Sequence, residues 1–239
     1  MNKRTHDLLY LDENRYEDVK DGFKFCASLL KNAGGFKAGH IVCDVGCAAG
    51  EYLYYLTKTF PSVTFRGYDL LPALVEKARI KVPQTSFFVG SVNDPSLMPS
   101  NSADACFLIG VHSIFEEFEP TFSNLISWVK PGGRCYIFGI FNAYPVDVYI
   151  KYRASERSGK GPFEAGWNMF SMKSITRFLD QHPAVSGHTF HKFTISVDLQ
   201  PNPADPVRSW TFKNAESHRL ITNGLSIIQQ QYALEIIKR

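Results

Sequence analysis

The stretch Ile41-Val-Cys-Asp-Val-Gly-Cys-Ala-Ala-Gly50 decides the fold of this chain. A short apolar run reaches the acid Asp44 and then enters a turn of small residues. Gly46 and Gly50 lack a Cβ atom where the backbone must turn sharply, which lets a ligand approach the chain closely. A helix is expected over residues 50–60. The stretch is therefore a strand-to-helix crossing of the kind that binds nucleotide-like ligands.

The same alternation of strand and helix continues along the chain. The apolar runs predict strands at 41–45, 64–69, 86–90, 104–109 and 134–140, helices near 50–60, 72–81 and 120–129, and later a helix at 171–181 and strands at 190–200 and 232–238. Strands that alternate with helices form a parallel sheet covered on both faces. With 239 residues, 44% of them hydrophobic, the chain can bury the core of a single α/β domain.

Asp69 stands at the end of the second predicted strand. A carboxylate at this position suits the two hydroxyls of a ribose, and it accepts their hydrogens equally well from adenosine or from NAD. Asp69 by itself therefore leaves both kinds of ligand open.

Three later segments complete the pattern. Ser86-Phe-Phe-Val-Gly-Ser-Val-Asn-Asp94 and Ala103-Asp-Ala-Cys-Phe-Leu-Ile-Gly-Val-His-Ser-Ile114 are predicted strands with polar carboxyl ends. In Trp128-Val-Lys-Pro-Gly-Gly-Arg-Cys-Tyr-Ile-Phe138, a helix is expected to stop at Pro131, after which two glycines turn the chain into a strand.

The five segments, in this order, resemble the signature segments of class I S-adenosylmethionine (SAM)-dependent methyltransferases. The glycine turn is similar to the family's Asp/Glu-x-Gly-x-Gly-x-Gly sequence, with Ala48 where the middle glycine is usual. Ser91 occupies the place where an aspartate usually follows the third strand's glycine, so the adenine contact falls to Ser91, Asn93, Asp94 or water. The resemblance implies a Rossmann-like, mostly parallel seven-stranded sheet with an antiparallel C-terminal strand pair and helices on both faces.

The resemblance also implies SAM as the methyl donor and S-adenosylhomocysteine as the product. The residues expected to hold the cofactor are Asp44, Gly46, Cys47, Ala48, Gly50, Asp69, Leu70, Ser91, Val92, Asn93, Ile109 and Tyr16. A metal is not expected.

A single domain, 1–239, is expected to have three parts. Residues 1–34 form a helical N-terminal lid from which Tyr16 reaches the cofactor, and residues 35–140 form the SAM-binding core. Residues 141–239 supply substrate-facing segments and the closing strands. Within them, 210–213 and 218–222 are expected to pair as an added hairpin, with Asn223-Gly224 as a turn; this insert either shapes the pocket or makes a dimer contact.

His112 is the candidate general base because it follows the fourth strand and histidine changes its protonation near neutral pH. Its alternative role is structural. The methyl acceptor is expected to lie against His112, Tyr144, Trp167 and Asn168, which offer flat apolar faces and a few hydrogen bonds. Trp167 could equally anchor the following helix on the sheet.

Charge and cysteine usage restrict the class of partner. A net charge of +3 is too small to indicate a nucleic-acid partner. The basic cluster of Lys151, Arg153, Arg157 and Lys160 fits either an anion-binding site or a solvated loop. Five cysteines without metal-binding spacing indicate a reducing compartment, and no stretch reaches transmembrane length. These features predict a cytoplasmic protein without a membrane partner, and a homodimer is a candidate assembly.

The sequence thus predicts a SAM-dependent methyltransferase that acts on an oxygen or nitrogen of a small molecule. An RNA or protein methyltransferase and a SAM-binding subunit without turnover stay open as alternatives. A dehydrogenase is the most distant one, and NAD binding would distinguish it.

Overall fold

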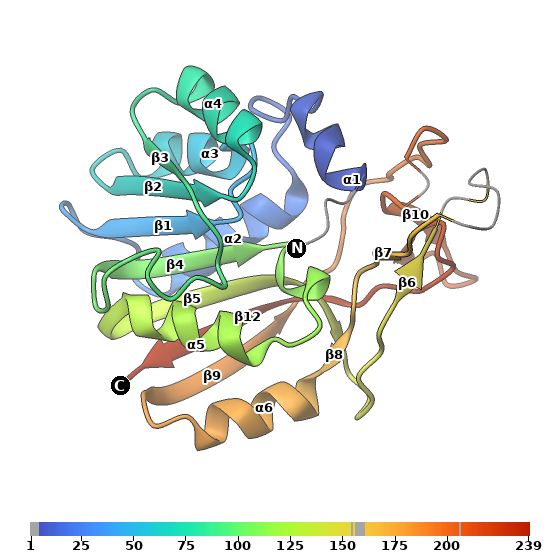
Figure 1. The fold of residues 1–239 in the computed structure, drawn as a ribbon. Helices are drawn as coiled ribbons and strands as arrows, with labels where there is room; N and C mark the ends of the chain where they lie inside the picture. Colours follow the sequence, from blue (N-terminus) through green and yellow to red (C-terminus); the bar gives the residue numbers. More distant parts are fainter. Residues whose placement is uncertain (1–4, 154, 156–160, 206) are drawn as a thin grey trace.

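The computed structural model describes residues 5–153, 155, 161–205 and 207–239, and its centre is a twisted mixed sheet (Figure 1). The strands follow the order β3-β2-β1-β4-β5-β12-β9, and the short β8 pairs with the end of β5. Their bounds are β1 Ile41–Val45, β2 Thr64–Asp69, β3 Ser86–Val89, β4 Ala103–Ile109, β5 Val129–Asn142, β8 Phe170–Ser171, β9 Val185–Lys192 and β12 Gln231–Lys238. The strands β1 to β5 run parallel, β12 runs antiparallel to β5, and β9 runs antiparallel to β12. The Rossmann-like sheet and its antiparallel closing pair are confirmed, with β8 as an eighth strand.

Helices cover both faces of the sheet (Figure 1). One face carries α2 Asp21–Asn32, α3 Glu51–Thr59 and α4 Pro72–Lys81; the other carries α5 Glu119–Trp128 and α6 Met172–Gln181. Successive strand side chains alternate between the faces. In β4, Phe107 packs beneath the α2–α4 layer, while its neighbour Leu108 packs beneath α5 and α6. Two buried layers therefore hold the central strands, as expected for a parallel sheet.

The boundaries of three predicted elements were wrong. The helix expected to stop at Pro131 ends at Trp128, and β5 already begins at Val129. The Pro-Gly-Gly segment forms an irregularity within β5, between its pairings with Ala103 and Ala105. The strand expected at 190–200 is β9, which begins at Val185 and ends at Lys192. It begins earlier because Val185 pairs with Lys238 at the end of β12, and it ends earlier because Lys192 pairs with Tyr232 near the start of β12.

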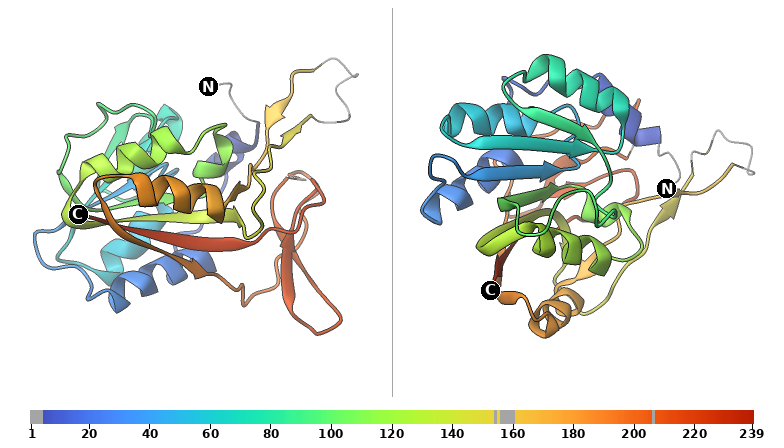
Figure 2. Two further views of the ribbon diagram at one scale, coloured as in Figure 1. Left: turned by 90° about the horizontal axis from the view of Figure 1, so that it is seen from below. Right: turned by 60° about the vertical axis from the view of Figure 1, so that its left-hand side comes forward.

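The remaining elements stand at the carboxyl ends of the parallel strands. The N-terminal segment forms α1 Thr5–Leu8 and η1 Leu9–Leu11 before α2, and η2 His112–Ile114 follows β4. Two small antiparallel pairs project from the sheet (Figure 2): β6 Lys151–Tyr152 with β7 Glu164–Ala165, and β10 Trp210–Lys213 with β11 Arg219–Thr222. The latter is the expected hairpin. Among the described residues, no helix has both the length and the apolar character to cross a membrane.

Candidate functional site

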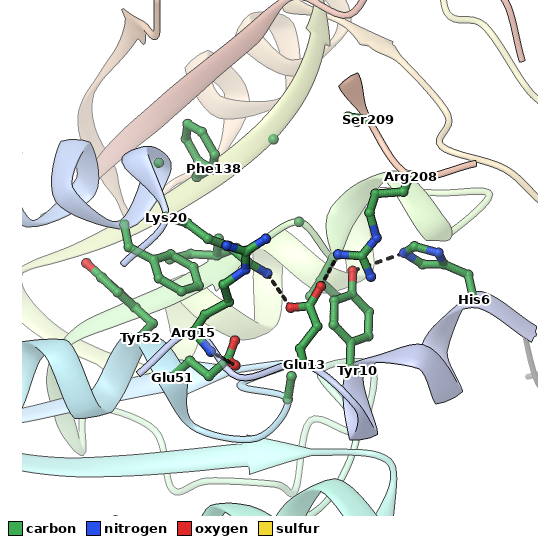
Figure 3. Close-up of a pocket in the computed structure, with 18 of the residues that line it drawn as sticks. His6, Tyr10, Glu13, Arg15, Lys20, Glu51, Tyr52, Phe138, Arg208 and Ser209 are labelled. Atoms are coloured by element: carbon green, nitrogen blue, oxygen red, sulfur yellow. Dashed lines mark hydrogen bonds and ion pairs between the residues drawn. The ribbon is translucent and has the colours of Figure 1, made fainter. Parts of the chain in front are cut away.

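A cavity of about 1290 Å³ opens at the carboxyl ends of β1, β2 and β4. In the strand order, β1 and β4 flank the point where the chain changes direction, which is where ligands bind in open α/β sheets. Pockets for small ligands typically have about 300–1,000 Å³. The N-terminal segment and a C-terminal insert formed by residues 197–209 line the opposite side of this cavity (Figure 3). The cavity is therefore large enough for a nucleotide-sized ligand and a second small molecule.

The glycine turn brings the backbone against this cavity. Gly46 has a φ of +80°, and a Cβ atom there would lie 2.4 Å from a methyl group of Val111. Gly50, at the start of α3, has a φ of +79°, and its Cβ would lie 2.8 Å from the Phe87 ring. Ala48 lies between them with a φ of +46°, a left-handed conformation that costs an L-residue energy. The expected glycines are thus required by the fold, and Ala48 adopts a conformation typical of the glycine it replaces.

Asp69 presents its carboxylate to the cavity in a fixed orientation. Its Oδ2 accepts a hydrogen bond from the Ala48 N–H at 2.8 Å, and its Oδ1 accepts one from the Leu71 N–H at 2.9 Å. Burial raises the pKa of Asp69, and the two backbone N–H groups oppose that rise. Each oxygen has a further lone pair, which can accept the hydroxyls of a ribose.

Asp44 is a buried carboxyl group with an unused oxygen. Its side chain is 2% exposed, and its Oδ1 has no hydrogen-bond partner within the described part of the chain. Burial, together with the charge of Asp69, raises the pKa of Asp44 to about 8. An unsatisfied carboxyl oxygen on a cavity wall is suited to a cationic or hydrogen-bonding ligand.

Most of the predicted cofactor residues meet in the cavity. Those that line it are Asp44, Gly46, Cys47, Ala48, Asp69, Leu70, Ser91, Val92 and Ile109. Gly50 shapes the turn from behind, and Asn93 lies outside the lining, where its Oδ1 accepts the Thr121 hydroxyl at 2.7 Å. Tyr16 also stands behind the turn: its hydroxyl donates to the Ala49 carbonyl at 2.8 Å, so it supports the turn from outside the cavity.

His112 lies below the cavity wall. Its side chain has no exposed surface, its ring stacks on Phe141 at 4.5 Å, and its Nε2 is 3.1 Å from the Ile140 carbonyl. Burial lowers the pKa of His112 to about 4, although the Ile140 carbonyl opposes the shift. The imidazole is therefore neutral at pH 7, and Ser113 of the same turn lines the cavity in its place.

The three other substrate candidates are dispersed. Trp167 lines the cavity and its ring meets that of His6 edge-on at 4.9 Å. Asn168 is buried behind it, donating through Nδ2 to the Phe115 carbonyl at 2.6 Å and through its N–H to the Ser113 carbonyl at 2.7 Å. Tyr144 is 70% exposed and lies outside the cavity lining, because the chain after β5 turns into solvent. Of the basic cluster, Arg157 and Lys160 lie outside the described residues.

The structure adds charged residues that the sequence did not single out. Glu13 contacts both Lys20 and Arg208 on the cavity wall (Figure 3). Glu51, at the first position of α3, accepts the Arg15 N–H at 2.7 Å, and His6 contacts Asp205 at 3.0 Å. An acid directly after the glycine turn was the one local signal, and it applied to Glu51. The contacts of Glu13 with Arg208 and of His6 with Asp205 join residues 195 and 199 positions apart in the chain.

Comparisons with known proteins agree with this geometry. Residues 42–133 match the family described as "Methyltransferase domain". Malonyl-[acyl-carrier protein] O-methyltransferase 1 of Ilyobacter polytropus is 26% identical over 124 residues, which cover 51% of this chain and 44% of that protein. The chain thus aligns with less than half the length of this curated relative.

Solved structures share the fold over a greater length. The YcgJ protein of Bacillus subtilis has a TM-score of 0.62 at 12% identity, covering 91% of this chain and 98% of that one. Phosphoethanolamine N-methyltransferase 2 of Haemonchus contortus, in complex with SAM, has a TM-score of 0.56 at 15% identity, covering 79% of this chain and 43% of that one.

Proposed function

We propose that this chain is a class I SAM-dependent methyltransferase that transfers a methyl group from SAM to an oxygen or nitrogen of a small molecule. The observation that carries the proposal is the pair of acids, Asp44 and Asp69, beside the glycine turn on one wall of the cavity. Asp69 is oriented by two backbone N–H groups, and Asp44 has a free buried oxygen.

The residues on this wall fit the cofactor. Asp69 would hold the ribose hydroxyls, Gly46 would let the ligand approach the backbone, and Asp44 would face a cationic group. Ser91 and Val92 would lie along the base, and Ile109 would stand nearest the centre of the sheet. The solved Haemonchus relative, which contains SAM, supports this choice of cofactor.

The opposite wall would hold the methyl acceptor. It is built from the N-terminal segment, Trp167 and the C-terminal insert, which face the strand ends across the cavity. SAM supplies an electrophilic methyl group on a sulfonium sulfur. The protein's part is then to align the methyl acceptor, exclude water and accept a proton where the acceptor carries one. The enclosure by two separate segments supports a small molecule as the acceptor and disfavours an extended nucleic acid or protein.

Calorimetric titration of the purified protein with SAM, S-adenosylhomocysteine and NAD tests the proposal. We expect both sulfur nucleotides to bind in the micromolar range and NAD not to bind. Binding of NAD without binding of SAM would contradict the proposed function. A screen of small hydroxyl and amine compounds for methylation follows from the expected result, and SAM binding without transfer to any class of compound would favour the non-catalytic subunit.

A further inference from the structure

A histidine of the N-terminal segment and an aspartate of the C-terminal insert meet on the cavity wall. His6 Nδ1 lies 3.0 Å from Asp205 Oδ1, and His6 Nε2 lies 3.2 Å from the Tyr10 hydroxyl (Figure 3 draws the latter contact). His6 is 5% exposed and Asp205 is 2% exposed, yet all three residues line the cavity. The group is buried in protein and still borders the space available to a ligand.

The contacts of His6 assign different roles to its two nitrogens. A carboxylate can only accept a hydrogen bond, so Nδ1 carries the proton toward Asp205, and Nε2 carries its lone pair toward the Tyr10 hydroxyl. Asp205 is itself held in place by Arg208, whose Nε donates to Oδ2 at 2.9 Å. An imidazole oriented in this way by a carboxylate is the arrangement in which histidine accepts a proton during catalysis.

The position of His6 relative to the sheet agrees with such a role. The Trp167 ring packs edge-on against His6, and the next residue, Asn168, donates its N–H to the Ser113 carbonyl beyond β4. His6 is thereby tied to the carboxyl end of β4, where Ile109 and Ser113 line the same cavity. Among the described residues that line the cavity, His6 is the only histidine, whereas His112 is covered.

We propose that His6 is the general base of the methyl transfer, with Tyr10 as the bridge to the methyl acceptor and Asp205 as a positioning residue. The inference rests on the proposed function and narrows its substrate class. A base serves an acceptor that must lose a proton, which is a hydroxyl or an amine; a carboxylate is already ionised at neutral pH.

The proton and electron movements balance within this group. The lone pair of the acceptor forms the bond to the methyl carbon, and the sulfur–carbon bond breaks with its electron pair remaining on sulfur. The acceptor's proton passes to the Tyr10 oxygen while the Tyr10 proton passes to His6 Nε2. The resulting imidazolium is stabilised by the adjacent Asp205 carboxylate.

A first experiment examines the base without any methyl acceptor. The full chain, labelled with ¹⁵N and saturated with S-adenosylhomocysteine, is titrated by NMR, and the His6 signals are assigned by their loss in His6→Asn. We expect the Nδ1–H tautomer at pH 8. In Asp205→Asn, the titration midpoint of His6 should move to lower pH by about one unit, because the negative charge beside the imidazolium is gone. The opposite tautomer or an unmoved midpoint would overturn the assignment.

A second experiment follows methyl transfer from labelled SAM to phenol, benzylamine and benzoate between pH 5 and 9. We expect transfer to phenol or benzylamine, at a rate that rises with pH and then levels off. His6→Asn retains a donor toward Asp205 but cannot take up a proton, so kcat should fall about 100-fold or more, with SAM affinity changed less than about twofold.

Tyr10→Phe should cause a similar loss, and the double variant should lose little more, since the two residues act as one unit. The control is His218→Asn, which changes an exposed histidine directly before β11 and should leave kcat unaltered. Transfer to benzoate alone would contradict the assignment of His6 as the general base. A kcat of His6→Asn within about threefold of that of the unaltered protein would contradict it as well. Failure to bind SAM in calorimetry would instead contradict the proposed function itself.

Discussion

Glu13 and Arg208 form an ion pair that joins the N-terminal segment to the C-terminal insert on the cavity wall (Figure 3). Lys20 Nζ contacts the second carboxylate oxygen of Glu13 at 2.8 Å, and Arg208 also holds Asp205. The Glu13 side chain is 8% exposed. The N-terminal segment and the C-terminal insert are thus joined by a shared cluster of charges that lines the cavity.

Glu13→Gln should make the protein less stable above pH 5. Burial alone would raise the pKa of Glu13, but the charges and hydrogen bonds of Lys20 and Arg208 outweigh it and hold the pKa at about 2. The stabilisation is therefore present above the usual value of 4.5 and is lost as the pH falls toward 2. In urea denaturation, we expect a loss of about 1.5–3 kcal/mol at pH 7, shrinking toward pH 2.

Glu76→Gln is the matched control for this prediction, because Glu76 makes an exposed ion pair with Arg79 on α4. It should change the free energy of unfolding by less than about 0.5 kcal/mol. Equal effects of the two variants would show that the Glu13 cluster does not hold the segments together.

Asp69→Asn should weaken SAM binding. The variant loses the charge that accepts the ribose hydroxyls, and its amide N–H₂ faces one of the two backbone donors, Ala48 or Leu71. A hydrogen bond to a charged group contributes about 1.5–3 kcal/mol, so calorimetry should show an affinity about 10- to 150-fold lower. Glu76→Gln is the control, because Glu76 is an exposed acid of α4 that does not line the cavity. Unchanged affinity in Asp69→Asn would contradict the assignment of Asp69 to the ribose.

SAM binding should release protons at pH 7. Burial and the charge of Asp69 raise the pKa of Asp44 to about 8, so the carboxyl group is mostly protonated in the free protein. A cationic ligand group favours the ionised form, so up to about one proton should leave per SAM bound at pH 7, falling toward zero well above pH 8. Calorimetry in buffers of different ionisation enthalpy measures this number. Asp44→Asn should abolish the release; a release that persists in this variant must come from another group.

Substitutions of the two small residues Gly46 and Ala48 should have opposite effects on the stability of the protein. Gly46→Ala places a Cβ atom 2.4 Å from Val111 at a φ of +80°, so we expect a loss of about 1–3 kcal/mol of stability together with weaker SAM binding. Ala48→Gly relieves a left-handed alanine at a φ of +46° and should leave stability unchanged or raise it by up to about 1 kcal/mol. Thermal unfolding measures the stability of both variants. A loss of stability in Ala48→Gly would show that packing of the alanine methyl group stabilises the turn more than its left-handed conformation costs.

His112→Leu should reduce the sensitivity of the protein to acid. Burial lowers the pKa of His112 from 6.5 to about 4, so the neutral ring stabilises the fold above pH 6.5 and this contribution is lost as the pH falls through 4. Between pH 6.5 and pH 4, this contribution to the free energy of unfolding falls by about 3 kcal/mol. Urea denaturation should show that the free energy of unfolding falls less between pH 7 and pH 4.5 in His112→Leu than in the unaltered protein. In His218→Leu, a change at an exposed position, it should fall as much as in the unaltered protein.

The sequence by itself determined the sheet and one wall of the cavity. Parallel strands end at one edge of a sheet, so local signals such as Gly46, Asp69 and Ser91 come together once the alternation of strands and helices is recognised. Each signal depends on short-range chemistry: a glycine where φ is positive, or an acid at a strand end. Boundaries at 129 and 185 depended instead on the strand that pairs alongside, and local patterns missed them.

Only the tertiary structure decided the other wall. The contacts of His6 with Asp205 and of Glu13 with Arg208 link the first residues of the chain to its last third, and neither partner has a local pattern that indicates the other. The burial of His112 is of the same kind, because the side chains that cover it come from β5 and α5, among them Phe141 and Phe122. Local sequence specifies backbone conformation, whereas the pairing of charges and the covering of a side chain depend on which distant segments the fold brings into contact.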